Sequence, residues 1–589
     1  MIKQLVISRL SRLICKDIQK RAFSSSMSTE ESLNQLGIKG AKKDKLIDEQ
    51  QCEDIQLANT YNRTFEDHLF EVLKNDKQLV PISKFIKGLE ATGLRTSDPR
   101  LKECMSKIFN IQSSLRERGG EDDSVTVDKE TFTECIRDNI TLIRKAFTTE
   151  LVIPEFGRFT QMLDDIYWRL KDRMDGKVAD YIPQLSRVSP ENWGVTVCSV
   201  DGQRHSIGDT SSPFCVQSVS KPLNYAIAIN DLGPDAVHQY TGHEPSGESF
   251  NEIKLGLNNK PHNPMINAGA IVVTSLLKNK EKLADRFDYI KKQYERIAGG
   301  EYIGFNNAVF LSERESADRN YALGYYLKEN KCFPEGVNLS ETLDFYFQLC
   351  SCDVTCESAS VIAATLANGG ICPITGDKIL SAVSVRNTLS LMHSCGMYDY
   401  SGQWAFNVGL PAKSGVSGLI LVVVPNVMGL ALWSPLLDRH GNSIRGISFS
   451  EELIRTFNFH NYDNLKHTVR KTDPRRRQME RKGQQIVTLL FGAYNGDVSA
   501  LRRQYLLGID MNQADYDGRT ALHISAAEGH IDCVTFLIET CGVDVSPKDR
   551  WNFSPLDDAN RFGHEKVVKY LKERLSKKAQ NTKNQAIFI

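Results

Sequence analysis

The sequence of 589 residues has no uninterrupted apolar run long enough to span a membrane. Its richest apolar stretch, GLILVVVPNVMGLALW (418–433), is broken by Pro425 and Asn426, so we interpret it as two buried strands joined by a turn. No charge predominates either, because 73 basic residues balance 73 acidic ones. We therefore expect neither membrane insertion nor nucleic acid as the main partner.

Regular cysteine spacing is also missing. The chain has 14 cysteines, and Cys350, Cys352 and Cys356 lie close together without a C-x-x-C pair or a matching set of histidines. Neither a zinc site nor a disulfide framework is indicated, and a reducing compartment is the simpler inference.

The first 26 residues form a basic, amphipathic segment that ends in serines, MIKQLVISRLSRLICKDIQKRAFSSSM with the following Met27. It contains one acidic residue, Asp17, and lacks the apolar core of a secretory signal, so it predicts a mitochondrial presequence. A disordered basic tail is the alternative, and Met27 is a possible internal start. Residues 27–64 are polar and predict a disordered linker.

Residues 65–150 contain several helical patterns. Two stretches, NDKQLVPISKFIKGL and DDSVTVDKETFTECI, echo one another as a polar turn, a short β-like piece and a helix. This is typical of a paired EF-hand, but the D-x-[DN]-x-[DN]-G pattern and closing Glu are missing. We predict an EF-hand-like all-α module without calcium sites.

Residues 151–465 mix strands and helices. WGVTVCSVDGQRHSIGD (193–209) predicts a hairpin with an Asp-Gly turn, and the apolar stretch at 418–433 predicts another. Because these hairpins flank a mainly helical middle, we expect one α+β domain closed by an antiparallel sheet.

The C-terminal part repeats. DGRTALHISAAEGHIDCVTFLIE begins at Asp517 and WNFSPLDDANRFGHEKVVKYLKE begins 34 residues later at Trp551, while LLFGAYNGDVSALRRQYL is a degenerate earlier copy. This pattern predicts ankyrin repeats over 483–577, which bind proteins or pack on their own chain. A disordered tail is expected at 578–589.

A serine precedes a lysine by three residues in QSVSKPLNYAIAINDLG (217–233). The i, i+3 spacing lets Ser218 and Lys221 touch at the start of a helix, where a lysine of lowered pKa can activate a serine nucleophile. Such an S-x-x-K occurs in penicillin-binding proteins and class A β-lactamases, although a surface Ser and Lys would read the same. Lys413-Ser414-Gly415 supplies a K-[ST]-G triad before a strong strand, but the S-D-N element is absent and the tyrosine-rich turn CGMYDYSGQW precedes the triad instead.

Four long stretches carry a closer resemblance. KPHNPMINAGAIVVTSLL, SERESADRNYALGYYL, SCGMYDYSGQWAFNVGLPAKSGVSG and the Ser218 segment resemble animal kidney-type phosphate-activated glutaminases, over residues 65 to 575. The resemblance implies a serine β-lactamase-like catalytic domain between the EF-hand-like module and the ankyrin repeats. It also implies hydrolysis of L-glutamine to L-glutamate and ammonia in the mitochondrial matrix. A homotetramer, possibly assembling further, and inorganic phosphate as activator with no cofactor are implied as well.

The same resemblance implies the catalytic roles. Ser218 would attack the amide carbon, Lys221 would take its proton, and Tyr398 would relay protons to ammonia and from water. The oxyanion would lie between the backbone N–H groups of Ser218 and Val416. Sequence alone does not separate Tyr398 from Tyr400, and the choice between them rests on the resemblance.

Substrate recognition is assigned in the same way. Glu313 would pair with the substrate ammonium, Asn267 and Asn320 would hydrogen-bond its carboxylate, and Tyr181 and Tyr346 would line the pocket. Each has an alternative: Asn267 as a helix cap, Tyr346 as a core aromatic, and Glu313 as a solvated charge.

The stretch SGESFNEIKLGLNNKPHNP resembles the mobile loop that gates the active site near a dimer–dimer interface. Glu252 stands where a lysine is usual and Lys254 where an aromatic is usual, so we expect altered loop packing, phosphate dependence and filament formation. Two other functions stay open: an amide hydrolase of the same class with another substrate, and a scaffold with a dead catalytic domain.

Overall fold

The computed structural model describes residues 64–116, 125–247, 252–463, 471–476, 478–506 and 509–586. The chain divides into two units, residues 1–72 and 73–589, and the described part of the first is most of helix α4 (Phe65–Leu73). The predicted presequence and nearly all of the predicted linker lie outside the described residues. Within the described residues, no helix combines the length and apolar character needed to cross a bilayer.

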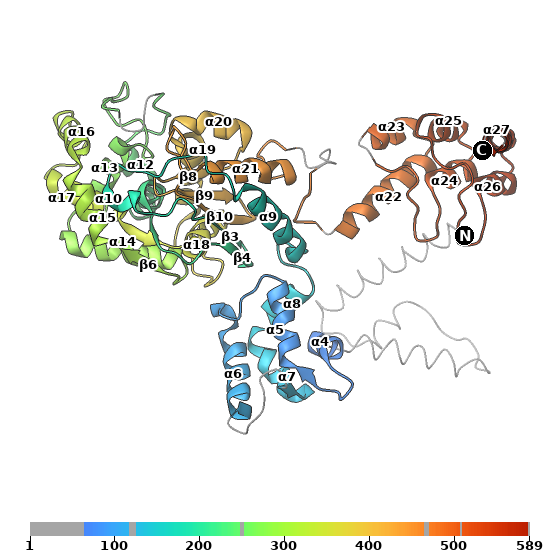
Figure 1. Ribbon diagram of the computed structural model, residues 1–589, viewed down its shortest axis with the longest axis horizontal. Helices are drawn as coiled ribbons and strands as arrows, with labels where there is room; N and C mark the ends of the chain where they lie inside the picture. The colour runs from blue at the N-terminus through green and yellow to red at the C-terminus, as the bar shows by residue number, and fades with distance from the viewer. Residues whose placement is uncertain are drawn as a thin grey trace, which may run out of the picture. The chain divides into compact units, whose positions relative to one another are not determined.

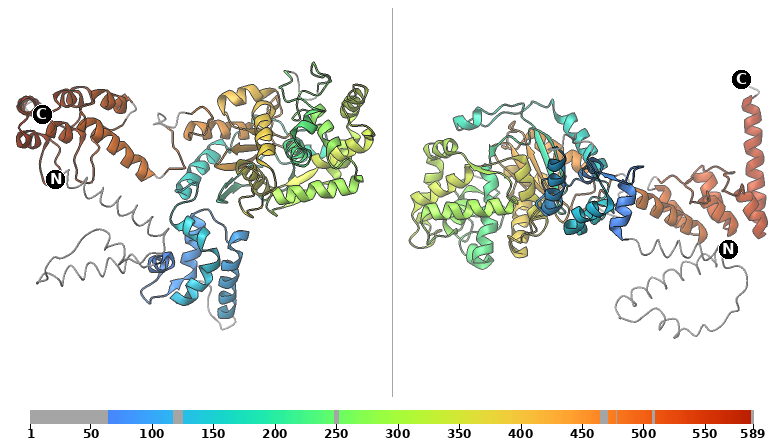
Figure 2. Two further views of the ribbon diagram at one scale, coloured as in Figure 1. Left: turned by 180° about the vertical axis from the view of Figure 1, so that it is seen from behind. Right: turned by 90° about the horizontal axis from the view of Figure 1, so that it is seen from below.

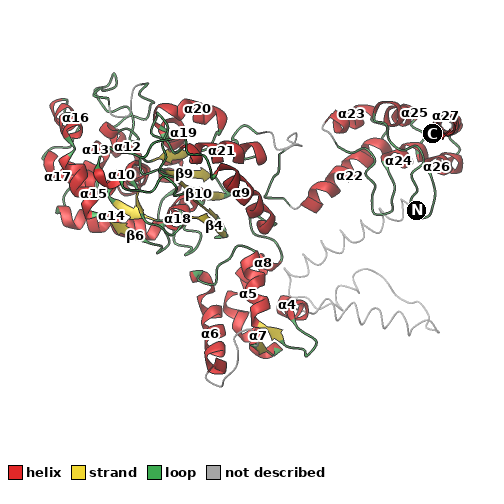
Figure 3. Cartoon of the chain, viewed as in Figure 1, coloured by secondary structure: helices red, strands yellow, loops and turns green. Residues whose placement is uncertain are grey.

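The helical region after α4 is built from two similar halves. Strands β1 and β2 pair in antiparallel fashion with Val80 opposite Val127, and each is followed by a helix, α5 or α7. The rings of Phe85 and Phe132 meet edge to face between these helices, with centroids 5.4 Å apart. The predicted EF-hand-like module is therefore confirmed (Figure 3). Its elements are β1 (Val80–Pro81), α5 (Ile82–Ala91), η1 (Pro99–Leu101), α6 (Lys102–Arg116), β2 (Thr126–Val127), α7 (Lys129–Ile136), η3 (Arg137–Asn139) and α8 (Ile140–Phe147).

The middle of the chain is an α+β domain on a five-stranded antiparallel sheet, with strand order β4-β3-β10-β9-β8. Both predicted hairpins are present, as β3–β4 and β9–β10. Strand β10 also pairs with β3, so strands from the two ends of the domain close one sheet, as the sequence predicts. The strands are β3 (Gly194–Ser199), β4 (Arg204–Gly208), β8 (Ala412–Ser414), β9 (Leu419–Val424) and β10 (Met428–Trp433).

Helices cover both faces of this sheet (Figures 1 and 2). Along β9, Ile420 and Val422 belong to the core shared with α9 (Phe156–Leu170) and α21 (Ile444–Thr456). The alternate residues Leu421 and Val423 belong to the core shared with α11 (Ser220–Leu232) and α18 (Cys356–Ala367). Burial on both faces explains why this strand reads as the continuous apolar run LILVVV.

The Ser218 segment is positioned by a second, three-stranded sheet of order β5-β7-β6. Strand β5 ends at Cys215, and the chain turns at once into η4, which carries Ser218, and then into α11. The remaining elements of the domain are α10 (Pro183–Ser186), β5 (Phe214–Cys215), η4 (Gln217–Val219), α12 (Pro234–His238), α13 (Asn267–Leu276), α14 (Leu283–Ile297), β6 (Ile303–Phe305), α15 (Asn307–Glu315), α16 (Asp318–Glu329), α17 (Leu339–Cys350), β7 (Cys352–Val354), α19 (Ala382–Cys395), η5 (Tyr398–Tyr400) and α20 (Ser401–Asn407).

The C-terminal region forms the predicted ankyrin stack. Thr520 and Ser554, at equivalent repeat positions, each cap a helix with a capping box, and Leu522 and Ala559 lie in one shared core. The last helix runs to Ala586, into the segment for which the sequence predicts a disordered tail, because its lysine, glutamine and alanine residues favour helix. The elements are α22 (Gln478–Tyr494), α23 (Val498–Leu506), α24 (Ala521–Ala527), α25 (Ile531–Thr535), the π-helical turn η6 (Phe536–Thr540), α26 (Pro555–Phe562) and α27 (Glu565–Ala586).

Two glycines of the catalytic domain give a matched stability test. A Cβ on Gly429 of β10 would lie 2.2 Å from the Ala364 backbone nitrogen of α18, whereas one on Gly402 of α20 meets nothing within 4 Å. We expect Gly429→Ala to destabilise the domain by about 1–3 kcal/mol through overpacking. The same change at Gly402, on an exposed helix, should be neutral or stabilise by about 0.5 kcal/mol.

Urea unfolding followed by fluorescence of the buried Trp193, Trp404 and Trp433 measures both variants. Equal midpoints for the two alanine variants would contradict the close packing of β10 on α18.

Candidate active site

Ser218 lies at a sharp turn between strand β5 and helix α11. The preceding residue, Gln217, has a φ of 49°, a left-handed backbone that costs a non-glycine residue about 1–3 kcal/mol. This turn presents Ser218 to Lys221, whose Nζ lies 3.0 Å from the Ser218 Oγ. The i, i+3 pair predicted from the sequence is thus in contact.

Lys221 is buried, with 1% of its surface exposed, and its amine meets neutral groups. Besides Ser218, it donates to the Asn267 Oδ1 at 2.8 Å. Burial lowers the pKa of Lys221 to about 8, and the Cys350 thiol and the Glu313 carboxyl act in the opposite direction. A lysine with this pKa is partly neutral near physiological pH and is able to accept the serine proton.

Asn267 joins three of the predicted site residues. It is the first residue of α13, whose N-cap is Ile266, and its side chain bonds to Lys221, Tyr346 and Asn320 instead, so the helix-cap alternative is wrong. Its Oδ1 also accepts from the Tyr346 hydroxyl at 3.3 Å, and its Nδ2 donates to the Asn320 Oδ1 at 3.2 Å. Tyr346 is a core aromatic of α17, as the alternative has it, but its polar end faces this network.

Glu313 accepts two hydrogen bonds at the other side of the serine turn. The Tyr181 hydroxyl donates to its Oε1 at 2.6 Å, and the Gln217 Nε2 donates to the same oxygen at 3.0 Å. Burial raises the pKa of Glu313 and these two donors lower it. The carboxyl is therefore held in place and half-buried, which excludes the alternative of a free solvated charge.

The structure separates Tyr398 from Tyr400. Tyr398 is 8% exposed; burial raises its pKa, and a hydrogen bond with Ser218 lowers it. The Tyr400 hydroxyl instead donates to the Glu451 Oε1 at 3.4 Å, away from the serine. Tyr398 also has a left-handed backbone, with a φ of 51°, so both segments that bring groups to Ser218 carry local strain.

Lys413 and Ser414 end strand β8, at the edge of the sheet, and Gly415 follows directly. A Cβ on Gly415 would lie 3.0 Å from the Val216 backbone oxygen, so the turn after β8 passes close to the serine turn. Val416 follows in this turn, and its backbone N–H donates to no backbone carbonyl in the described part of the chain. Its position beside Ser218 suits an oxyanion donor.

Sequence reasoning did not assign roles to three further residues. Lys413 is fully buried with its Nζ 4.4 Å from the centroid of the Tyr398 ring, and burial together with Lys221 lowers its pKa well below that of a free lysine. Lys413 is the lysine of the K-[ST]-G triad, so the motif already marked this residue. Gln217 orients Glu313, and its place before the serine was the only hint. The Cys350 Sγ lies 3.8 Å from the Ser220 Oγ, and no motif marks it.

In the loop that contains Glu252 and Lys254, exposed side chains alternate with partly buried ones. Ile253 and Leu255 pack against the core formed by α13 and α17, whereas Glu252 and Lys254 are exposed. The Glu252 carboxylate lies 4.0 Å from the Arg319 guanidinium of α16. The charge at position 252 therefore faces a basic residue of its own chain.

Comparison with known proteins gives three matching family models. The glutaminase model matches residues 176–462, an EF-hand domain model matches residues 65–154, and a model of three ankyrin repeats matches residues 489–584. The chain is also 57% identical over 507 residues to a protein of Rattus norvegicus named "Glutaminase liver isoform, mitochondrial", covering 86% of this chain and 83% of that relative. The chain belongs to the glutaminase family.

Other family members span more distant organisms. The "Putative glutaminase 2" of Caenorhabditis elegans is 51% identical over 538 residues, covering 90% of this chain and 89% of the relative. "Glutaminase 1" of Bradyrhizobium diazoefficiens is 43% identical over 300 residues, covering 51% and 48%. A solved structure titled "Probable glutaminase ybaS" is 36% identical and covers 52% of this chain and 98% of its own, with a TM-score of 0.49. The family is thus confirmed, and the finer assignment to the kidney type stays a prediction.

The lowered pKa of Lys221 is directly measurable in this glutaminase. In protein labelled with 13C at the lysine ε-carbon, we expect one resonance to titrate near pH 8, because burial disfavours the charged amine. Lys221→Met identifies the signal by its loss. Titration of that signal near 10.4, the ordinary lysine value, would contradict the electrostatics described for the site.

Proposed function

We propose that this protein hydrolyses the side-chain amide of L-glutamine to L-glutamate and ammonia through a glutamyl ester of Ser218. The observation that carries the proposal is the 3.0 Å contact between the Ser218 Oγ and the Nζ of a buried lysine with a pKa of about 8. A neutral amine at that distance is a general base for the serine hydroxyl.

In the first half of the reaction, Lys221 accepts the proton of Ser218 while the oxygen attacks the amide carbon. The backbone N–H groups of Ser218 and Val416 stabilise the oxyanion, and Tyr398 passes a proton to the departing ammonia. Lys221 returns the serine proton through Tyr398 to the ammonia, so both groups are neutral before the second half. Water then attacks the ester carbon and gives its proton through Tyr398 to Lys221. Lys221 returns a proton to the Ser218 Oγ as its bond to the glutamyl carbon breaks and glutamate leaves.

The polar groups around the serine suit an α-amino acid. Glu313 is a carboxylate for the ammonium, and the linked amides of Asn267 and Asn320 supply hydrogen bonds for the carboxylate. Tyr181 is 49% exposed and bonded to Glu313, and it forms one wall at the entrance, with the polar end of Tyr346 deeper in. This set favours glutamine over another amide, and the assembled serine, lysine and tyrosine speak against a dead scaffold.

The test is ammonia release from L-glutamine by the purified full-length protein. We expect Ser218→Ala to lower kcat by at least about a thousandfold, because the oxygen that forms the ester is removed. The rate of the native protein should fall as pH drops through about 8, since protonated Lys221 cannot accept a proton. Tyr400→Phe is the matched control for Tyr398→Phe and should retain activity.

No ammonia release from folded protein would reject the glutaminase activity. Full activity of Ser218→Ala would reject the serine ester while leaving the activity itself in place.

We also propose a mitochondrial matrix location, an active homotetramer and activation by inorganic phosphate. The location is supported by the names of the mitochondrial relatives and by the basic N-terminal segment. The ankyrin repeats are a further protein-binding surface. Phosphate and assembly rest on the family resemblance, with the loop around Glu252 as the point at which this chain differs.

The loop difference can be measured through the phosphate response. Because Glu252 faces Arg319, we expect Glu252→Lys to replace an attraction with a repulsion and to shift the phosphate concentration for half-activation by a few fold. Light scattering during the titration reports the tetramer, and Lys254→Phe tests the neighbouring position. An identical phosphate response in both variants would exclude a role for these residues.

A further inference from the structure

We propose that a cavity behind Val416 is a second ligand site, which takes an amino or hydroxy acid with an apolar side chain and couples its binding to turnover. The ligand part stands on the cavity alone, and the coupling rests on the proposed function.

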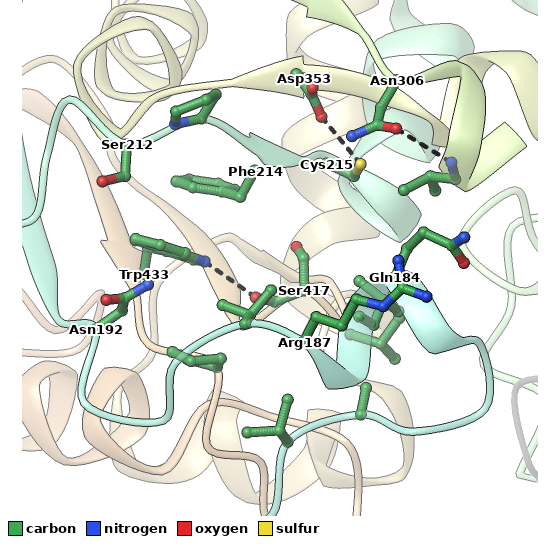
Figure 4. A pocket seen from close by; sticks show the side chains of 18 of the residues that line it. Gln184, Arg187, Asn192, Ser212, Phe214, Cys215, Asn306, Asp353, Ser417 and Trp433 are labelled. Carbon is green, nitrogen blue, oxygen red and sulfur yellow. Dashed lines mark hydrogen bonds between the residues drawn. The ribbon is translucent and has the colours of Figure 1, made fainter.

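The cavity has a volume of about 460 Å³, within the range of small-molecule sites, and shares only Val416 with the proposed catalytic residues (Figure 4). It opens between the segment that contains α10, the start of α15 and the turn after β8. The polar and charged side chains on its wall are Gln184, Arg187, Ser189, Asn192, Ser212, Asn306, Asp353 and Ser417.

Two buried polar atoms on this wall have no hydrogen-bond partner among the described residues, the Ser417 Oγ and the Gln184 Oε1. Ser417 is 6% exposed. Buried polar atoms in folded proteins are nearly always partnered, so each unpartnered atom needs an explanation. A ligand with a hydrogen-bond donor explains both.

Arg187 supplies a positive charge beside Gln184. No described residue forms an ion pair or a hydrogen bond with its guanidinium, and Figure 4 shows it on the same side of the cavity as the Gln184 amide. A guanidinium binds a carboxylate, and the Gln184 Oε1 accepts from a donor next to it. A carboxylate with an adjacent ammonium or hydroxyl is the signature of an α-amino or α-hydroxy acid.

The far side of the cavity has an aromatic surface, with the polar residues Ser212 and Asn192 beside it (Figure 4). The rings of Phe214 and Trp433 are stacked with centroids 4.5 Å apart and 13° between their planes, and both residues are buried. The Trp433 Nε1 already donates to the Ser417 backbone oxygen at 3.0 Å, so the indole offers no donor to a ligand. The ligand body against this wall is therefore apolar.

Asp353, the acidic side chain on the cavity wall, is engaged by two neighbouring side chains. The Cys215 thiol donates to its Oδ1 at 2.9 Å, and Asn306 also hydrogen-bonds it. Burial raises the pKa of Asp353, and these two hydrogen bonds lower it.

The cavity wall is continuous with the catalytic site through three segments. Val309 lines the cavity and lies one helical turn before Glu313 on α15. Ala179 lines it two residues before Tyr181, which donates to Glu313. Val416 lines the cavity, and its N–H is the proposed oxyanion donor. A ligand in contact with Val309, Ala179 and Val416 should stabilise the hydrogen bond between Tyr181 and Glu313 and lower the KM for glutamine.

The experiment is calorimetric titration of L-phenylalanine into full-length Ser218→Ala protein saturated with L-glutamine, so that the catalytic site is occupied. We expect one binding event per chain. 3-Phenylpropanoate, without the ammonium, and 2-phenylethylamine, without the carboxylate, should each bind about tenfold more weakly or not at all.

Variants of the wall locate the binding. Arg187→Gln should weaken the binding of L-phenylalanine about tenfold. Val188 also lines the cavity, and Val188→Trp should abolish binding by filling it. Arg158→Gln, an exposed arginine of α9 outside the cavity, is the control and should bind as the parent does. Circular dichroism confirms that the variants are folded.

Kinetics of the native enzyme complete the test. L-phenylalanine should lower the KM for glutamine in native and Arg158→Gln enzyme but not in Val188→Trp enzyme, whose basal rate should be unchanged. Competition with glutamine, or binding that survives Val188→Trp, would overturn the proposal, as would a cavity that holds water only and gives no heat with L-phenylalanine. Absence of ammonia release would reject the proposed activity, whereas the titration repeated without glutamine still decides the ligand site.

Discussion

The burial of the Lys221 amine without a facing carboxylate is the constraint on which the rest of the site depends. A charged amine loses its hydration when buried, so the environment favours the neutral form that can take a proton from Ser218. A carboxylate against this amine would restore its charge and remove the base. Glu313, the nearest negative group to act on it, is held on the other side of the serine turn by Tyr181 and Gln217.

The burial of Lys221 depends on the helices that cover both faces of the sheet. Helix α11 carries Lys221 and packs into the core that also contains α18 and one face of the sheet. The opposite face is closed by α9 and α21. The edge strand β8 then delivers a second buried lysine, Lys413, beneath the ring of Tyr398. The charge of Lys221 disfavours a charge on Lys413, and this adds to burial in lowering the pKa of Lys413.

Left-handed backbone conformations occur in the two segments that meet at Ser218. Gln217 and Tyr398 both have left-handed backbones. Gln217 immediately precedes Ser218, and the Tyr398 side chain forms a hydrogen bond with Ser218. Such conformations persist only when the surrounding structure fixes them. Before Gln217, the Val216 N–H donates to the Cys352 backbone oxygen at 2.8 Å. Around Tyr398, the Ser401 Oγ accepts from the Met397 N–H at 3.0 Å and donates to the Tyr398 backbone oxygen at 2.7 Å.

The sequence by itself determined the modules and predicted the pairing of Ser218 with Lys221. Short apolar runs, Asp-Gly and Pro-Asn turns and the 34-residue repeat are local signals, so the hairpins and the ankyrin stack were predictable. The i, i+3 spacing of Ser218 and Lys221 is local too. Only the tertiary structure decided which of Tyr398 and Tyr400 faces the serine, that Asn267 links Lys221 to Asn320, and that Gln217 and Lys413 join the site. These contacts join segments far apart in the chain, and their energies depend on burial, which no local pattern encodes.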